Sequence, residues 1–271
     1  MQIPKYFNFL KIKDQIQHEL FFNKTPVRII SLVPSQTELL VDLGLENELV
    51  GITKFCVHPK GLLKRKEIIG GTKQINIDKI KALKPDFILC NKEENTKKIV
   101  TICAEIAPTY VSDIYTIANT IDFINDIGLI LDCKYAAKKM TDAIVKSYTK
   151  FKEFAQNKPK LKVAYFIWAN PYMVVGGDNF IDQMLQINNF DNVYKNQNRY
   201  PQIELESLKN VDLILLSSEP FPFKEKHALE IKKYTNATIH FVDGEMFSWF
   251  GSRLLLSFRY FEKFRKSLGL I

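Results

Sequence analysis

The chain has 271 residues, 46% of them hydrophobic, and a formal net charge of +8. This hydrophobic content is enough for a full core and excludes a disordered chain, and no apolar run reaches the roughly 18 residues of a membrane-spanning helix. The charge comes from scattered lysines without a helix-turn-helix or RNA-binding signature, which indicates a solvated surface and no nucleic-acid partner. The four cysteines form no Cys-x-x-Cys pair, which argues against a disulfide framework and a structural zinc site.

Short apolar runs alternate with amphipathic ones in the first half of the chain. Two extended segments, 3–12 and 18–22, precede a β-branched run at 28–33 that has no polar break, as expected of a buried strand. Asn76 is a suitable cap for the helix that follows it. The predicted strands of this half are 28–33, 49–53, 86–91 and 108–112, and the predicted helices are 37–45, 77–84, 95–106 and 115–131.

A long amphipathic helix is predicted near the middle of the chain, from Lys134 to Asn157. Apolar residues recur there at steps of three and four, the spacing of one helix face, while lysines occupy mostly the other face. No Gly or Pro interrupts the pattern before Pro159, which is a stop signal. At 1.5 Å per residue the helix would span roughly 36 Å, about the diameter of a small domain.

The same scheme begins again after Pro159. The predicted elements there are strands 162–169, 172–175, 212–217 and 238–242 and helices 179–187, 204–210, 224–234 and 249–268. Strands that alternate with helices predict parallel sheets with right-handed crossovers. The predicted fold is α/β, with two Rossmann-like lobes and a connecting helix. Their predicted bounds are 1–131 for the N-terminal lobe, 132–158 for the helix and 159–271 for the C-terminal lobe.

Ligands of open parallel sheets bind outside the carboxyl ends of the strands. The loops expected at such ends are 34–37, 54–59, 91–95, 168–172, 217–223 and 244–249. Four of these six loops are rich in aromatic or metal-ligating side chains. That concentration indicates a ligand-binding edge, whatever the family of the protein.

Aromatic side chains dominate the second-half loops, and their place outside the strands favours a ligand pocket over core packing for part of the set. They are Trp168, Tyr172, Tyr200, Phe221, Phe223, Phe247, Trp249 and Phe250. In the first half, Cys56 and His58 stand two residues apart and point the same way if the segment is extended. A neutral imidazole is a common metal ligand, and a surface histidine held by a backbone hydrogen bond is the alternative.

No motif in the chain indicates catalysis. Ser35 has no GxSxG elbow and no evident His–Asp partners, and the Gly-Gly pairs at 70–71 and 176–177 stand in no nucleotide-binding motif. The remaining histidines lie in unrelated segments, which argues against a dedicated zinc centre. We therefore expect no enzymatic activity and no catalytic cofactor.

Two stretches, RIISLVPSQTELLVDLGLENELVGITKFCVHP and GGTKQINIDKIKALKPDFILCNKEEN, resemble the corrinoid- and siderophore-binding branch of the periplasmic binding proteins. These proteins are the substrate-binding components of ABC importers for vitamin B12, iron chelates and haem. The resemblance runs from about 28 to about 264, and WANPYMVVGG, RYPQ and SEPFPF follow in the family's order. It implies two α/β lobes joined by one rigid helix, with the ligand in the cleft between them.

The resemblance is closest to the cobalamin-binding type, and it implies roles for individual residues. Tyr200 and Trp168 fall on pocket aromatics of the family, whereas Thr72 replaces a pocket tryptophan. The segment 54–58, with Phe55, Cys56 and His58, would form a wall of the pocket together with Ser35. His58 would then coordinate the corrin cobalt or cover its upper face.

The family also carries one acid on each lobe that meets arginines of the transporter permease. Asp78 matches the position on the first lobe. On the second lobe, counting forward from RYPQ gives Glu206 and counting back from Asp212 gives Glu204; Glu206 is preferred. The alternative is that these acids only stabilise the helix dipole.

The function predicted from these features is non-catalytic binding of a cobalamin-like corrinoid, for delivery to an ABC importer or for carriage inside the cell. An iron-siderophore or haem binder is the alternative, but the chain has few arginines, and only Arg199 and Arg253 lie near the nominated loops. A corrinoid- or metal-cluster-dependent enzyme would need converging cysteines, and only Cys56 lies in a suitable loop. An interaction protein that has lost its ligand is a further possibility.

The location is predicted from the start of the chain. The sequence begins at Met1 without a signal peptide or a lipoprotein cysteine, which favours a cytoplasmic protein. A periplasmic or other extracytoplasmic location is the alternative if the natural chain begins upstream. The protein is expected to be a monomer.

Overall fold

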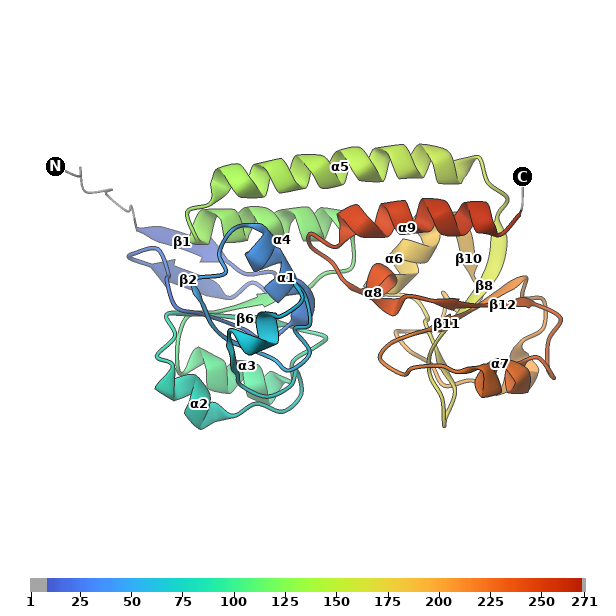
Figure 1. The fold of residues 1–271 in the computed structure, drawn as a ribbon, viewed down its shortest axis with the longest axis horizontal. Helices are drawn as coiled ribbons and strands as arrows, with labels where there is room; N and C mark the ends of the chain where they lie inside the picture. Colours follow the sequence, from blue (N-terminus) through green and yellow to red (C-terminus); the bar gives the residue numbers. More distant parts are fainter. Residues whose placement is uncertain (1–8, 270–271) are drawn as a thin grey trace. The chain divides into compact units, whose positions relative to one another are not determined.

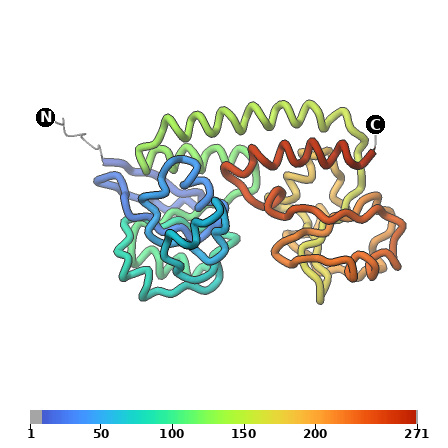
Figure 2. The backbone as a smooth tube through the Cα atoms, in the orientation of Figure 1, coloured from blue at the N-terminus to red at the C-terminus, as the bar shows by residue number. Residues whose placement is uncertain are grey.

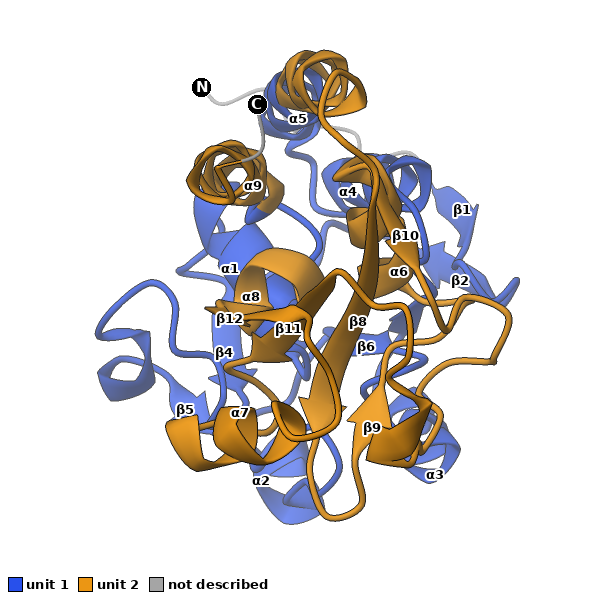
Figure 3. Ribbon diagram, turned by 90° about the vertical axis from the view of Figure 1, so that its right-hand side faces the viewer, with its two compact units in different colours: residues 1–144, 250–253 blue, residues 145–249, 254–271 orange. Residues whose placement is uncertain are grey.

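Parallel strands form the centre of each half of the protein. The computed structural model describes residues 9–269, and within them the strands form two five-stranded sheets and one two-stranded hairpin (Figure 1). The chain divides into two compact units (Figure 3). Residues up to 144 together with 250–253 form unit 1, and residues 145–249 together with those from 254 onward form unit 2. The predicted α/β class with parallel sheets is confirmed.

The sheet of unit 1 consists of β3 Ile29–Ser31, β4 Leu49–Ile52, β5 Glu67–Ile68, β6 Phe87–Asn91 and β7 Thr109–Ser112. Its strand order is β5-β4-β3-β6-β7, and all neighbours are parallel. The helices of this part of the chain are α1 Pro34–Asp42, α2 Ile77–Ala82, α3 Lys97–Ala104 and α4 Ile117–Ile130, with a 3₁₀ helix at Leu62–Lys64. Every residue of β3 and β6 is buried, as expected for central strands covered on both faces.

Side chains cap three of these helices. Asn76, Thr96 and Thr116 each accept a hydrogen bond from the backbone N–H three residues further along, so the predicted cap at Asn76 is confirmed. Ahead of the sheet, an antiparallel hairpin pairs β1 Leu10–Lys13 with β2 Glu19–Phe22. The predicted extended segment 3–12 lies partly outside the described residues.

The sheet of unit 2 consists of β8 Leu161–Trp168, β9 Met173–Val174, β10 Phe190–Asn192, β11 Leu213–Ser217 and β12 Thr238–Val242. The parallel strands follow the order β10-β8-β11-β12, and β9 pairs with β8 in the antiparallel direction. The helices are α6 Phe180–Ile187, α7 Glu225–Ile231, α8 Gly244–Ser248 and α9 Leu254–Ser267, with a 3₁₀ helix at Leu205–Ser207.

The predicted long helix is present as α5, Lys134–Gln156, which Figure 2 shows as one unbroken helical trace. The division between the two units falls inside it, after Ile144. Its unit 2 part is held by aromatic packing, because the ring of Phe151 lies 6.0 Å from that of Phe258 and 5.8 Å from that of Phe261.

The C-terminal part differs from the prediction of one closing helix over 249–268. The chain instead forms α8, leaves the helical conformation, and starts α9 at Leu254. Gly251 has φ of +92°, a left-handed conformation that glycine adopts without strain. Residues 250–253 belong to unit 1, where the ring of Phe250 packs 6.1 Å from that of Phe123. Tertiary packing, which local periodicity does not report, therefore interrupts the helix.

Among residues 9–269, no helix combines the length and the apolar character that crossing a membrane requires.

Candidate functional site

The carboxyl ends of the parallel strands in unit 2 bring three loops to one edge of the sheet. These loops follow β8, β11 and β12, as predicted. A further segment joins them, because Val174 N–H donates to Pro201 O at 3.0 Å and Gly176 N–H donates to Arg199 O at 2.7 Å. These bonds run along β9 and place Tyr200, which is half-buried, beside that strand.

Trp168 and Phe221 form a partly exposed aromatic pair at this edge, called here the aromatic edge. Trp168 ends β8 and is 41% exposed, and its ring centroid lies 5.5 Å from that of Phe221. Behind Phe221 the buried rings of Phe223 and His227 follow at 5.0 Å and 5.2 Å. The predicted ligand residue Phe223 therefore belongs to the layer that supports the aromatic edge.

Tyr172 lies in the loop between β8 and β9, and its ring packs 5.9 Å from that of Phe166. Its hydroxyl donates a 2.7 Å hydrogen bond to Oε2 of Glu230 on α7. Burial, with the Glu230 carboxylate as the second cause, raises the pKa of the Tyr172 hydroxyl. This hydroxyl already has a strong acceptor within the protein.

Two other predicted pocket aromatics lie mainly in the interior. Phe247 is completely buried, with its ring 4.6 Å from that of Phe261 and 5.1 Å from that of Tyr165. The expectation that Phe247 faces a ligand is corrected, because its ring fills the core between β8 and α9. Trp249 is 8% exposed, and its indole N–H donates a hydrogen bond to a carboxylate in the loop after β11.

Glu219 receives that indole N–H and was not predicted as a site residue. Its Oε1 accepts hydrogen bonds from Trp249 Nε1 at 3.0 Å and from Ser248 Oγ at 2.7 Å, which joins the loop after β11 to α8. The two segments approach closely at Gly244, where an added Cβ would lie 2.4 Å from Ser217 Oγ and 2.5 Å from Glu219 Cγ. In the sequence, Glu219 is a single acid among small residues and prolines. That pattern does not predict which side chains donate hydrogen bonds to it.

In unit 1 the loop after β4 presents Phe55, which is 49% exposed, and His58, which is half-buried. Cys56 is completely buried, and its Sγ lies 3.1 Å from Thr37 Oγ1 and 3.2 Å from Thr53 Oγ1. Burial raises the pKa of the Cys56 thiol. The expected joint presentation of Cys56 and His58 is therefore corrected, because the thiol is enclosed by threonine hydroxyls.

Ser35 is also enclosed, in the first turn of α1. One turn later, Glu38 forms a two-pronged ion pair with Arg253: Nε donates to Oε2 at 2.9 Å and Nη2 donates to Oε1 at 2.7 Å. Both side chains are largely buried, and burial raises the pKa of Glu38 against the opposing effect of Arg253. The guanidinium is thus engaged by a carboxylate of unit 1.

The two acids predicted for transporter docking are both exposed. Asp78 lies in the first turn of α2, and Glu206 lies in the first turn of the 3₁₀ helix Leu205–Ser207. Glu204, the alternative to Glu206, is the exposed N-cap of that helix. Each acid is described within its own unit, and its docking role stays a prediction.

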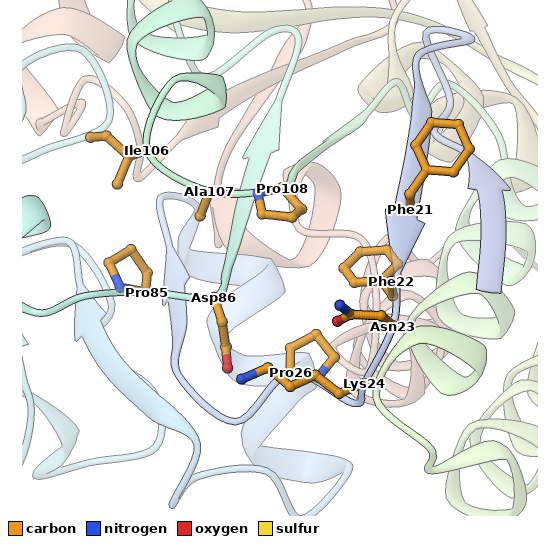
Figure 4. Close-up of a pocket in the computed structure, with 10 residues that line it drawn as sticks. All are labelled: Phe21, Phe22, Asn23, Lys24, Pro26, Pro85, Asp86, Ile106, Ala107 and Pro108. Atoms are coloured by element: carbon orange, nitrogen blue, oxygen red, sulfur yellow. The ribbon is translucent and has the colours of Figure 1, made fainter. Parts of the chain in front are cut away.

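A pocket of about 220 Å³ lies at the opposite, amino-terminal edge of the unit 1 sheet (Figure 4). Asp86 lines it just before β6, and its carboxylate accepts the backbone N–H groups of Val27 at 3.0 Å and Arg28 at 2.7 Å. This pocket is therefore distinct from the predicted ligand loops. Within the described part of the chain, no three His, Cys, Asp or Glu side chains gather as a metal site.

Comparison with known proteins agrees with this architecture. The family model described as periplasmic binding protein matches residues 29–233. An uncharacterised ABC transporter substrate-binding lipoprotein of Bacillus subtilis is 27% identical over an alignment of 212 residues. The alignment covers 73% of this chain and 65% of the relative, so the chain spans less than two thirds of the length of that relative. A vitamin B12-binding protein of Vibrio vulnificus is 24% identical over 75% of this chain and 72% of its own length.

Solved structures share the fold across nearly the whole chain. The periplasmic vitamin B12-binding protein of Vibrio cholerae has a TM-score of 0.77 and 19% identity, covering 90% of this chain and 98% of that one. Proteins whose structures are described as heme-binding and siderophore-binding reach TM-scores of 0.78 and 0.76. These likenesses confirm the predicted fold of two α/β lobes with a long connecting helix.

These matches correct one expectation and confirm another. The predicted cytoplasmic location is wrong, because the matched family is one of periplasmic proteins and the Bacillus relative is a lipoprotein, so an extracytoplasmic location is favoured. The same family consists of binding proteins, which confirms the prediction of a non-enzymatic chain.

Proposed function

The chain belongs to the periplasmic binding protein family, and from this premise we propose that it binds a cobalamin-like corrinoid and delivers it to an ABC importer. The carrying observation is the aromatic edge, where Trp168 and Phe221 lie 5.5 Å apart at the carboxyl ends of β8 and β11. Exposed aromatic rings fixed on a buried layer suit a broad, flat macrocycle. The names of the relatives support both the ligand class and the transporter.

Haem and ferric siderophores are the competing ligands, since binders of both share the fold. Both kinds of ligand commonly carry negative charges that would call for basic partners. The loops 168–172, 217–223 and 243–249 contain no Lys or Arg, and the joined segment 199–201 contributes one basic residue, Arg199. That composition favours a corrinoid, whose periphery carries neutral amides.

Titration of the purified protein tests the proposal. Cyanocobalamin and aquocobalamin are added with tryptophan fluorescence and the visible spectrum as readouts, and haem and a ferric siderophore are titrated in parallel. We expect saturable quenching by the cobalamins, because the chain has only two tryptophans and one of them is Trp168. A response to haem alone or to the ferric chelate alone would contradict the proposal. It would show that the protein binds that metal chelate instead of a corrinoid.

We further propose that His58 of unit 1 is an axial ligand of the corrin cobalt. Its imidazole is half-buried in the loop after β4, so it keeps access to solvent. A neutral imidazole suits a cobalt centre, as it suits other transition metals. The enclosed thiol of Cys56 leaves His58 as the only metal-ligating side chain that the segment 54–58 presents at the surface.

A further inference from the structure

The segment that carries Tyr200 lies very close to the backbone that follows β9. Arg199 N–H donates to Gly177 O at 3.0 Å, and Gly177 N–H donates to Gln197 O at 2.7 Å. An added Cβ at Gly176 would lie 2.1 Å from Gln197 O. Only glycine fits such a close approach of two backbones, so the Gly176-Gly177 pair joins the end of β9 to the residues just before Tyr200.

The buried side chain of Asn179 holds this junction together. It is 3% exposed and caps α6, because its Oδ1 accepts a backbone N–H of the first helical turn at 2.9 Å. Its Nδ2 donates to three carbonyl oxygens, at 3.0 Å to Gly177, 3.1 Å to Gly176 and 3.2 Å to Arg199. One buried amide thus connects α6, the glycine pair and the residue that precedes Tyr200.

Arg199 adopts a backbone conformation that needs this support. Its φ is +54°, in the left-handed region that residues other than glycine rarely occupy, because their side chains crowd the backbone there. Hydrogen bonds at both its N–H and its carbonyl oxygen hold the residue in that conformation. The direction in which the chain leaves Arg199 decides where the ring of Tyr200 lies.

Resting on the proposed function, we infer that Asn179 is a positioning residue of the ligand site: it holds Tyr200 in the orientation that contacts the corrinoid. Its own side chain is buried and acts only through the backbone of Arg199. An aromatic ring that is already held in its bound orientation loses little conformational entropy when a ligand covers it. Without the hold, the segment would populate other conformations, and affinity would fall although every contacting group is still present.

The test removes the amide donor and keeps the helix cap. Asn179→Asp and Asn179→Ser both retain an oxygen that can cap α6, and the serine variant introduces no charge. The matched control is Asn188→Asp at the other end of α6, where the Nδ2 of a completely buried asparagine donates to Met184 O at 2.8 Å. Calorimetry measures cyanocobalamin affinity for each variant, for Tyr200→Ala, and for each Asn179 substitution combined with Tyr200→Ala. Chemical denaturation measures their stability.

We expect either Asn179 substitution to weaken cyanocobalamin binding by about tenfold, as when the competent orientation is populated about a tenth of the time. In Tyr200→Ala protein the same substitution should change affinity by less than about twofold, because the ring through which it acts is already absent. Asn188→Asp should lower stability and leave affinity at the wild-type level, which would separate positioning from a general loss of stability.

Wild-type affinity in both Asn179 variants, or in Tyr200→Ala, would overturn the inference. Equal weakening by the Asn179 substitutions with and without the Tyr200 ring would also overturn it, since Asn179 would then act by another route. Both outcomes leave cyanocobalamin binding by the wild-type protein intact. Failure of the wild type to bind cyanocobalamin would instead overturn the proposed function and this inference with it.

Discussion

Trp168 is the residue through which unit 2 can offer most aromatic surface to a ligand. Its ring is 41% exposed and tilts by 59° against Phe221. An aromatic side chain already held by a neighbour loses little conformational entropy when a ligand covers it. Its removal should therefore lower affinity more than the loss of a more mobile side chain.

Trp168→Ala is expected to weaken cyanocobalamin binding by about tenfold or more, the size typical of an aromatic anchor. Trp168→Phe should retain most of the affinity, because it keeps a ring against Phe221. Isothermal calorimetry measures both variants, with Tyr135→Ala as a control, since Tyr135 is 85% exposed at the start of α5. Wild-type affinity in Trp168→Ala would show that the aromatic edge does not contact the ligand.

His58 is tested at the same scale by its effect on cobalt. His58→Ala is expected to abolish the spectral shift that aquocobalamin undergoes on binding, because the imidazole could no longer replace the cobalt-bound water. The spectrum of cyanocobalamin, whose upper ligand is held firmly, should change little. His18→Ala is the control, as that side chain is 63% exposed in the N-terminal hairpin. An unchanged spectral shift in His58→Ala would show that His58 does not coordinate the cobalt.

At the scale of elements, the ion pair between Glu38 and Arg253 fastens the segment 250–253 to α1. The segment stands between α8 and α9 in sequence, yet its packing belongs to unit 1. The side chains of Glu38 and Arg253 are only 12% and 4% exposed, and two charge-assisted hydrogen bonds join them. Removal of one partner would leave a buried charge without compensation.

Arg253→Ala is therefore expected to lower the free energy of unfolding by about 3 kcal/mol. The double variant Glu38→Gln, Arg253→Ala should recover part of that loss, because no buried carboxylate remains. The matched control is Arg65→Ala, which breaks a similar two-pronged pair with Glu46 at an exposed site and should leave stability nearly unchanged. Chemical denaturation measures all three, and equal losses for Arg253→Ala and Arg65→Ala would contradict the role of burial.

At the scale of the whole molecule, ligand binding and transporter docking are expected to use different surfaces. Asp78 and Glu206 are exposed in first turns of short helices, one in each unit, and neither lies in the loops that carry the aromatic edge. Exposed acids of this kind act on a charged partner mainly through the rate and orientation of encounter.

Asp78→Lys and Glu206→Lys are expected to leave cyanocobalamin affinity unchanged while lowering uptake through the cognate importer by about tenfold or more. Uptake by cells or proteoliposomes measures the effect. Glu204→Lys, which changes a neighbouring exposed acid, distinguishes the two alignments of this segment. Undiminished uptake by all three variants would show that these acids take no part in docking and only stabilise the helices in which they lie.

The spacing of apolar residues predicted most helices and strands, because that spacing follows which side chains a helix or strand buries. The three- and four-residue spacing from Lys134 predicted α5, and the unbroken apolar runs predicted β6 and β11, which are buried at every position. The strands β5 and β10 were missed, because two or three residues are too few for a period to show. The break before α9 was missed because its cause, packing of 250–253 on unit 1, is remote in sequence.

The sequence by itself determined the α/β class, the alternation of strands and helices, and the loops that gather at the carboxyl ends of the strands. Only the tertiary structure decided which loop residues face outward. Trp168 ends β8 and Phe247 lies in α8, soon after β12; both are aromatic, but Trp168 is 41% exposed and Phe247 is completely buried. Burial and hydrogen bonding, as at Cys56 and Glu219, depend on partners from distant segments, and spacing along the chain carries no record of those partners.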